Sequence, residues 1–175
     1  MPERSIIGNT LSQLTYGLYI VSSRDGEKLN GQIVNSVFQV TAEPPKVAIS
    51  LHKNNLTHSY VGKSRIFSVS VLSQDTPMID IGLFGFKCGR DVNKFAKIAH
   101  KFSDSCPIVT ENALSVFACK VVSSLDIGTH TLFIGEVYDA ETFKEGVPLT
   151  YEYYKIVKKG RTQKNATTYT EPKGV

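Results

Sequence analysis

A short polar segment, Ser50–His58, combines residue types that bind anions. It holds a cation, amides, hydroxyls and two imidazoles, and it follows an alternating apolar pattern over residues 46–51. A helix is expected directly after this strand, and the first turn of a helix offers free backbone N–H groups and a partial positive charge. Lys53, Thr57 and those N–H groups could therefore bind a phosphate. The alternative is that one of the two asparagines in the segment only caps the helix.

A second polar segment, Asn30–Thr41, is unusual for a strand because polar side chains recur among its β-forming residues. A flat polar ring system needs such donors and acceptors along one edge. Gly31 would let a planar ligand approach the backbone closely, since glycine has no side chain. The pattern leaves a second interpretation open, in which the segment is a solvated strand at the edge of a barrel.

Common signatures of other functional sites are absent from the sequence. The three glycines at Gly82, Gly85 and Gly89 are spaced wrongly for a dinucleotide fingerprint or a phosphate-binding P-loop. The four histidines show no metal-protease spacing, and no Cys-x-x-Cys pair or Gly-x-Ser-x-Gly turn occurs. We therefore predict no metal site, and three reduced thiols at Cys88, Cys106 and Cys119. Any nucleotide must be held in another way.

Strand patterns dominate the elements that must position these segments. Period-two alternation with β-branched and aromatic residues predicts half-buried strands, at residues 16–23, 33–41, 46–51, 67–71, 114–123 and 130–140. Asp25-Gly26 predicts a tight hairpin turn after the first strand. About six strands with turn signals between them favour a closed or nearly closed antiparallel barrel.

Helical patterns are few. Apolar residues at Val92, Phe95 and Ala99 recur with helical spacing, and Asp91 could cap their first turn. This predicts a surface helix over residues 91–101. Shorter helices are expected at residues 54–61, after the polar segment, and at residues 76–84.

The bulk composition is that of an ordinary globular chain of 175 residues, with 41% apolar and 21% charged residues. No apolar run approaches the roughly 20 residues that span a bilayer, and no signal peptide is recognisable, so we expect a cytoplasmic protein that does not enter a membrane. The net charge of +4 lies mainly in residues 155–175. This basic tail could be a solvated end or bind an anionic partner, but no aromatic platform or known module supports nucleic-acid binding.

Sequence blocks in a fixed order carry a resemblance that spans nearly the whole chain. They include Asn30-Gly31-x-x-x-Asn35-Ser36-x-x-Gln39-Val40-Thr41, Lys53-Asn54-Asn55-x-Thr57-His58, Gly89-Arg90-Asp91-Val92-x-Lys94-Phe95 and Gly128-x-His130-x-x-x-x-Gly135. This order resembles the flavin reductase family with the FMN-binding split-barrel fold. The end of the chain, with Tyr153-Tyr154 and Lys164-Asn165-Ala166, is similar to the flavoredoxin and high-molecular-weight rubredoxin branch.

The resemblance implies a mainly β fold, a six-stranded antiparallel Greek-key split barrel with a few short peripheral helices. It implies an FMN-binding domain over residues 1–154 and a tail over residues 155–175 that packs on the partner in a homodimer. The isoalloxazine edge would contact Asn30, Gly31, Gln32, Asn35, Ser36, Gln39, Val40 and Thr41. The ribityl phosphate would contact Ser50, Lys53, Asn54, Asn55, Thr57 and His58, with further contacts from Gly89, Arg90 and the tail residues Tyr154, Lys158 and Lys164.

The implied activity is hydride transfer from NADH or NADPH to FMN, and then electron transfer to an acceptor. His130 is the residue expected to face the flavin or the nicotinamide. Cys88, Thr129 and Thr167-Thr168 depart from the family pattern, and the first two of these departures favour an alternative, a flavoredoxin-like electron carrier reduced by a protein donor. The chain has no rubredoxin-type cysteine pairs, so a rubredoxin partner would be a separate chain.

Overall fold

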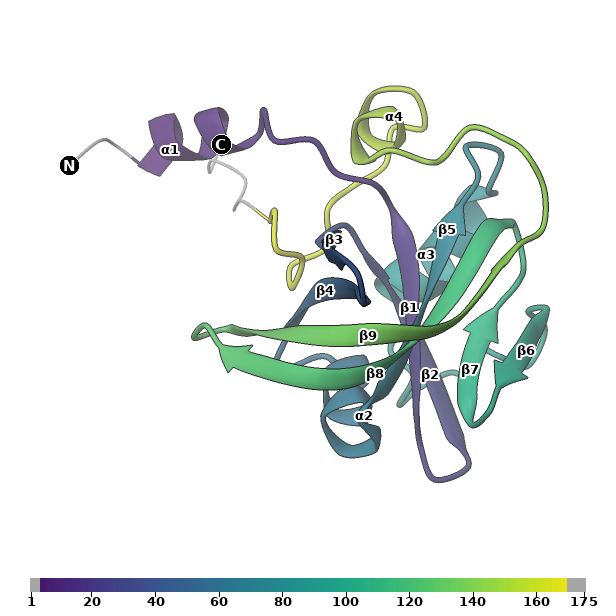
Figure 1. Cartoon of the computed structure of the whole chain (residues 1–175). Helices are drawn as coiled ribbons and strands as arrows, with labels where there is room; N and C mark the ends of the chain where they lie inside the picture. Colours follow the sequence, from purple (N-terminus) through teal and green to yellow (C-terminus); the bar gives the residue numbers. More distant parts are fainter. Residues whose placement is uncertain (1–3, 170–175) are drawn as a thin grey trace.

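The computed structural model describes residues 4–169, and its main element is one antiparallel sheet (Figure 1). Seven strands are ordered β2-β1-β5-β8-β9-β4-β3. They are β1 (Tyr19–Asp25), β2 (Lys28–Val34), β3 (Val37–Ala42), β4 (Pro45–His52), β5 (Ile66–Leu72), β8 (Ala113–Asp126) and β9 (His130–Thr142). A separate hairpin consists of β6 (His100–Ser103) and β7 (Cys106–Val109). The mainly β antiparallel class is confirmed.

The expected count of six strands is wrong because the single strand predicted over residues 33–41 divides in two. Its first part belongs to β2, which pairs with β1, and its second part is β3, which pairs with β4. The chain changes direction at Asn35 and Ser36, where the Ser36 carbonyl accepts a hydrogen bond of 3.1 Å from the Ser50 backbone N–H. The Asp25-Gly26 turn is confirmed, with Gly26 at φ +59°.

The sheet curls around an apolar core that alternation along the strands supplies. Phe67 and Val69 of β5 point into this core, together with Ile49 and Leu51 of β4. Ser68, on the other face of β5, is also buried, because β7 covers that face and its Pro107 carbonyl accepts the serine hydroxyl at 2.6 Å. β5 is therefore buried on both faces rather than half-buried.

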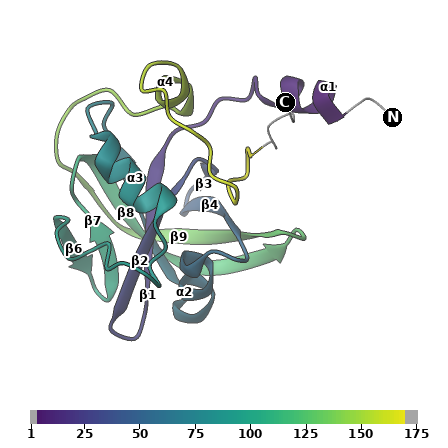
Figure 2. The ribbon, with the colours of Figure 1, turned by 180° about the vertical axis from the view of Figure 1, so that it is seen from behind.

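Four helices lie outside the sheet: α1 (Arg4–Leu11), α2 (Leu56–Ser64), α3 (Met78–Phe86) and α4 (Tyr151–Ile156). α2 and α3 confirm the helices expected near residues 54–61 and 76–84. Both contact β2, and seen from behind, α3 lies across the strands (Figure 2). The expected boundary between residues 154 and 155 falls inside α4, so the tail does not begin at the end of an element.

The helix predicted over residues 91–101 is wrong. Turns occupy this stretch, and β6 begins at His100. The Asn93 side chain accepts a hydrogen bond from the backbone N–H of Phe95 at 3.1 Å, which competes with helical pairing. Lys94, within the predicted surface helix, points inward instead and is only 4% exposed.

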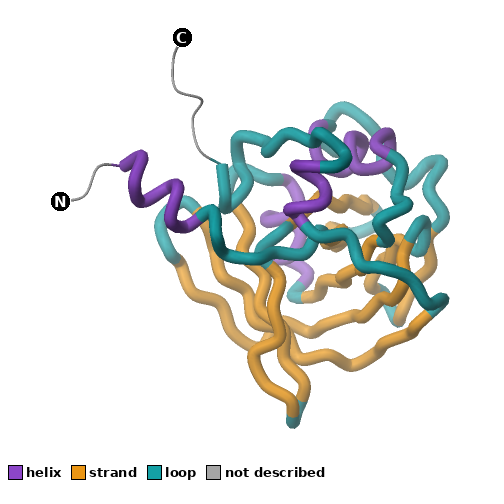
Figure 3. The backbone as a smooth tube through the Cα atoms, turned by 90° about the horizontal axis from the view of Figure 1, so that it is seen from above, coloured by secondary structure: helices purple, strands orange, loops and turns teal. Residues whose placement is uncertain are grey.

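The barrel is incomplete along one side. β2 and β3 are the edges of the sheet, and β2 contacts β4 without pairing with it in the described residues. From above, the strands curve beside a layer of helices and long loops (Figure 3). We call the gap in pairing between β2 and β4 the barrel split. Within residues 4–169, no helix has the length and apolar character needed to cross a membrane.

Candidate functional site

Two adjoining hollows lie beside β2 at the barrel split. The split hollow is lined by β2, β4, α3, α4 and residues 161–167. The basic hollow is lined by β2, residues 54–57, residues 84–90 and Lys94. The two share lining residues, which are Gln32, Gly85, Phe86, Gln163 and Asn165.

Buried polar atoms without partners face these hollows. Among the described residues, Gln32 Oε1, Ser50 Oγ and Asn30 Oδ1 are buried and find no hydrogen-bond partner. Leaving such an atom unpaired costs about 1–3 kcal/mol. The alternation of β4 explains Ser50, because Ile49 and Leu51 point into the core and Ser50 therefore points to the split. The three atoms indicate a site built for a polar ligand.

Two histidines stand opposite each other at one edge of the split hollow. His52 of β4 pairs across the ladder with His130 of β9, and their ring centroids are 4.8 Å apart. His130 Nδ1 lies 2.9 Å from Thr129 Oγ1, while its Nε2 is buried with no partner among the described residues. Burial, and then the nearby His52, lowers the pKa of His130. Its imidazole is therefore neutral at neutral pH.

The basic hollow lies where α2 begins. Arg90 and Lys87 line it, together with the residues that precede α2. Thr57, which is fully buried, accepts a hydrogen bond of 2.9 Å from Asn30 Nδ2 and so joins α2 to β2. A Cβ at Gly89 would lie 2.1 Å from Asn30 Oδ1. Only glycine lets the loop carrying Arg90 approach β2 this closely.

Lys94 is a lining residue that the sequence analysis missed. Its Nζ donates to the Gly31 carbonyl at 2.8 Å and to the Phe84 carbonyl at 3.3 Å. Burial lowers the pKa of this ammonium to about 8. The helical spacing of its apolar neighbours pointed to a surface helix and hid it. His52, Lys87 and Gln163 were missed as well, since none of them carries a spacing signal of its own.

Some residues expected to bind the cofactor do not line either hollow in the described part of the chain. Lys53 Nζ instead pairs with both carboxylate oxygens of Asp126, each at 2.7 Å. Arg90 and Lys94 line the basic hollow and Lys53 does not, so phosphate binding by Lys53 stays a prediction. Also outside are His58, whose Nε2 lies 2.8 Å from Thr131 Oγ1, and Lys158, whose Nζ donates to the Thr76 carbonyl at 3.0 Å.

The exposed strand β3 carries three further expected residues away from the hollows. Gln39 Nε2 donates to the Thr41 carbonyl at 3.1 Å, and the Thr41 hydroxyl donates to the Pro44 carbonyl at 2.6 Å. Val40 is exposed beside them.

Gly31 of β2 has a different role from the one expected, because a Cβ there would meet Ser22 Oγ at 2.9 Å and Phe84 Cε1 at 3.1 Å. Its lack of a side chain serves packing.

The remaining expected residues divide between the hollows and their surroundings. Ser36 donates to Asn35 Oδ1 at 3.2 Å beside the split hollow, and Lys164 is exposed. The structure brings the others together along the two hollows, namely Asn30, Gln32, Asn35, Ser50, Asn54, Asn55, Thr57, Gly89, Arg90 and Tyr154. These ten residues come from every block of the sequence that could bind a ligand except the one around His130.

The tail closes the split hollow of its own chain. Asn165 Nδ2 donates to Asn55 Oδ1 at 2.9 Å, and Asn35 Nδ2 donates to Thr168 Oγ1 at 2.8 Å. Figure 2 shows the C-terminal segment passing between α4 and the β3–β4 hairpin. The sequence analysis placed this segment on a partner subunit, but the described residues contact their own chain. Whether a second subunit adds to the site stays a prediction.

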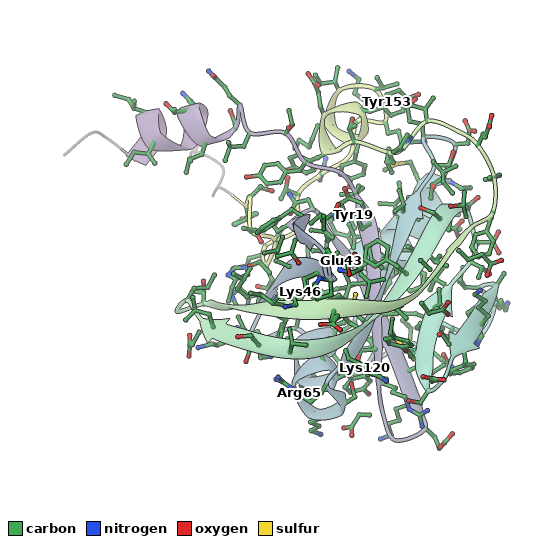
Figure 4. The ribbon with its side chains drawn as sticks, in the orientation of Figure 1. Tyr19, Glu43, Lys46, Arg65, Lys120 and Tyr153 are labelled. Carbon is green, nitrogen blue, oxygen red and sulfur yellow. The ribbon has the colours of Figure 1, made fainter. Side chains whose placement is uncertain are left out.

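Figure 4 labels Tyr153 on α4 at the top of the view, and Arg65 and Lys120 at the bottom. Arg65 ends α2, whose first turn lines the basic hollow, but neither Arg65 nor Lys120 lines a hollow.

The comparisons with known proteins agree on one family. Residues 11–158 match the model for the flavin reductase like domain. The chain is 46% identical to a ferric-chelate reductase (NAD(P)H) of Archaeoglobus fulgidus over 92% of this chain and 96% of that protein. It is 44% identical to a high molecular weight rubredoxin of Moorella thermoacetica, over 91% of this chain and 70% of that protein. The fold is similar to that of flavoredoxin from Methanosarcina acetivorans, with a TM-score of 0.69, 21% identity and coverage of 77% and 74%. The chain therefore belongs to the flavin reductase like domain family.

Proposed function

We propose that this chain is an FMN-binding reductase that uses NADH or NADPH as its hydride donor. The observation that carries the proposal is the row of unpaired buried polar atoms in the barrel split, next to a hollow that contains Arg90 and Lys94. The relatives named as NAD(P)H ferric-chelate reductase and FMN reductase (NADH) support the choice of donor.

The residues present fit FMN. Its ring N–H and ribityl hydroxyls can donate hydrogen bonds, and Gln32 Oε1 and Asn30 Oδ1 are acceptors that need donors. Its phosphate is an anion, and Arg90 and Lys94 are cations on the wall of the basic hollow, beside the start of α2. The split hollow would hold the ring and the basic hollow the phosphate. The shared residue Gln32 would then contact the ribityl chain between them.

FMN supplies the redox chemistry when bound, and the protein supplies binding, orientation and a shielded environment. The tail shields the split hollow from water through the hydrogen bonds that Asn165 and Thr168 make to the body. His130 is neutral, because burial lowers its pKa, and the tail covers it through the backbone of Asn165, so a second substrate would reach it only if the tail moves. The protein thus acts mainly by holding two reactants in place.

The test is spectroscopic. The full-length protein is loaded with FMN, transferred to an anaerobic cuvette and mixed with NADH or with NADPH. We expect at least one donor to bleach the visible flavin absorbance at a rate that saturates with donor concentration. If the loaded protein keeps its spectrum with both donors, the reductase proposal fails.

A flavoredoxin-like electron carrier is the second candidate. Residues 161–167 line the split hollow and restrict the entry of a nicotinamide, and one relative is named a high molecular weight rubredoxin. Such a carrier would accept electrons from a small redox protein on a separate chain. Rapid anaerobic reduction by reduced rubredoxin or ferredoxin, with no reduction by either nicotinamide, would select this candidate over the reductase.

The homodimer and the cytoplasmic location are further parts of the proposal. Exposed apolar side chains on β3, such as Phe38 and Val40, support a second copy of the chain as partner. Light scattering of the purified full-length protein would give twice the chain mass for a dimer. A single-chain mass at micromolar concentration would contradict it.

A further inference from the structure

The buried ammonium of Lys94 lacks a counter-charge. Burying a charge is costly unless it is paired, yet no carboxylate among residues 4–169 forms an ion pair with it. Its two hydrogen bonds go to the neutral carbonyls of Gly31 and Phe84. An ammonium has three N–H donors, so one remains for a ligand in the basic hollow that Lys94 lines.

No carboxylate lines the basic hollow among the described residues, and the Cys88 thiol is the one acidic group there; a negative charge on it raises the pKa of Lys94. The segment from residue 87 to residue 90 contributes Lys87, the Cys88 thiol and Arg90, and Arg90 Nη1 lies 3.6 Å from Cys88 Sγ. β2 and the start of α2 contribute only neutral amides and the Thr57 hydroxyl. The described part of the hollow is therefore strongly cationic, and an anion bound there would face three basic side chains.

We propose that Lys94 is the charge that lets the site distinguish a phosphorylated flavin from an unphosphorylated one, and that binding the phosphate draws a proton onto this lysine. The inference rests on the proposed function, since it assumes that FMN occupies the basic hollow. Without an anion, burial holds the pKa of Lys94 near 8. A bound phosphate favours the ammonium and raises this pKa.

Two results follow from this coupling. At pH 8 about half of the ligand-free protein carries a neutral Lys94, so FMN binding takes up about half a proton. Affinity for FMN falls as the pH rises through 8, because the proton must come from an ever more basic solution. Riboflavin lacks the phosphate and takes up none. The phosphate itself contributes nothing here, because its second pKa is about 6.

The experiment is calorimetric titration of the flavin-free full-length protein with FMN and with riboflavin, at several pH values from 6.5 to 9. Two buffers of different ionisation enthalpy at each pH give the number of protons taken up. Lys94→Met should weaken FMN binding about tenfold to a hundredfold, the range for a charge-assisted hydrogen bond, while changing riboflavin binding less than about threefold. Proton uptake at pH 8 should vanish in this variant.

Controls separate Lys94 from its neighbours. Lys97→Met removes an exposed lysine three residues along, which lines neither hollow, so this variant should keep the uptake. Lys94→Arg keeps the charge but does not titrate in this range, so it should bind FMN without uptake. This variant keeps the test valid if Lys94→Met does not fold.

The outcomes are distinct. FMN binding without proton uptake at pH 8 in the unaltered protein overturns the role of Lys94 and leaves the flavin site in place. Equal losses for FMN and riboflavin in Lys94→Met also overturn it, because a merely structural lysine would affect both. If neither flavin binds, the proposed function and this inference both fail.

Discussion

Gly89 shows how closely the site depends on single residues. A Cβ at this position would lie 2.1 Å from Asn30 Oδ1, whereas nothing lies within 4 Å of one at Gly82. Gly89→Ala should push the loop carrying Arg90 away from β2. We expect FMN affinity to fall about tenfold or more, in line with overpacking costs of roughly 1–3 kcal/mol. Fluorescence titration measures this.

The control is Gly82→Ala, which replaces a glycine inside α3 where there is space. It should leave FMN affinity unchanged and stabilise the fold by up to about 1 kcal/mol. If Gly89→Ala binds FMN as tightly as this control, the close approach of the loop to β2 has no part in binding.

Lys94 should give the ligand-free protein an unusual alkaline stability profile. Its pKa is about 8 in the fold against an ordinary 10.5. Between these values Lys94 binds more protons in the unfolded chain than in the folded chain, so this residue alone adds stability as the pH rises. The buried thiols of Cys106 and Cys119 act in the opposite direction above pH 9, because burial raises their pKa values to about 12. The full contribution of Lys94 to the free energy of unfolding is about 3 kcal/mol, because each pKa unit corresponds to about 1.4 kcal/mol. Urea unfolding at pH 8, 9 and 10 measures it.

Lys94→Met removes the contribution of this lysine, so the variant should lose stability relative to the unaltered protein as the pH rises from 8 to 10. A stability difference between the two proteins that does not change with pH would contradict the assignment to Lys94.

Two half-buried histidines, His58 and His130, should make the fold sensitive to acid. Burial is the largest cause of the lowered pKa values of both His58 and His130. The unfolded chain then binds more protons once the pH falls below the ordinary value of 6.5, and stability is lost in that window. Thermal unfolding at pH 7 and pH 5.5 tests this. His130→Gln should lose less stability over the same interval, and an equal loss would contradict the assignment.

At the scale of elements, the tail has a defined anchor. A Cβ at Gly160 would lie 2.1 Å from the ring of Tyr154, whose hydroxyl donates to the Arg161 carbonyl at 2.8 Å. Gly160→Ala should therefore lift residues 161–169 from the split hollow. Truncation after Gly160 should act in the same direction. We expect FMN to dissociate several-fold faster from both variants in a stopped-flow exchange experiment.

Gly62→Ala is the matched control, because α2 has free space at this glycine. Dissociation rates that are equal in Gly160→Ala, the truncated chain and this control would show that the tail does not cover the flavin.

The elements that sequence predicts well are those with a clear residue pattern. Apolar and polar residues alternate along β4 and β5, which locates both strands although both are buried on both faces, and α2 follows a strand with polar residues at the turn. The helix over residues 91–101 fails because its apolar spacing arises from a loop packed against β2 through Lys94. The strand over residues 33–41 breaks because its halves pair with different neighbours, and pairing is a property of the whole sheet.

The site, like the sheet, could be predicted only where the pattern within one segment is enough. Asn30, Gln32 and Ser50 could be found because polar residues inside a strand pattern are unusual. Their partners could not, since Lys94 and the tail reach the hollows only through contacts between segments far apart in the sequence. Lys53 was expected at the phosphate because it precedes a helix, and the sequence did not indicate its ion pair with Asp126 of the β8–β9 hairpin. Its contact with the phosphate stays a prediction.

At the scale of the whole molecule, the account depends on the barrel split between β2 and β4. This opening in the sheet is where the unpaired polar atoms, the basic hollow and the tail meet. A crystal structure of the full-length protein with FMN tests this placement directly. The account predicts ring density in the split beside Gln32 and Ser50, and phosphate density beside Arg90 and Lys94. Phosphate bound at Lys53, or a ring lying on the exposed face of β3, would contradict it.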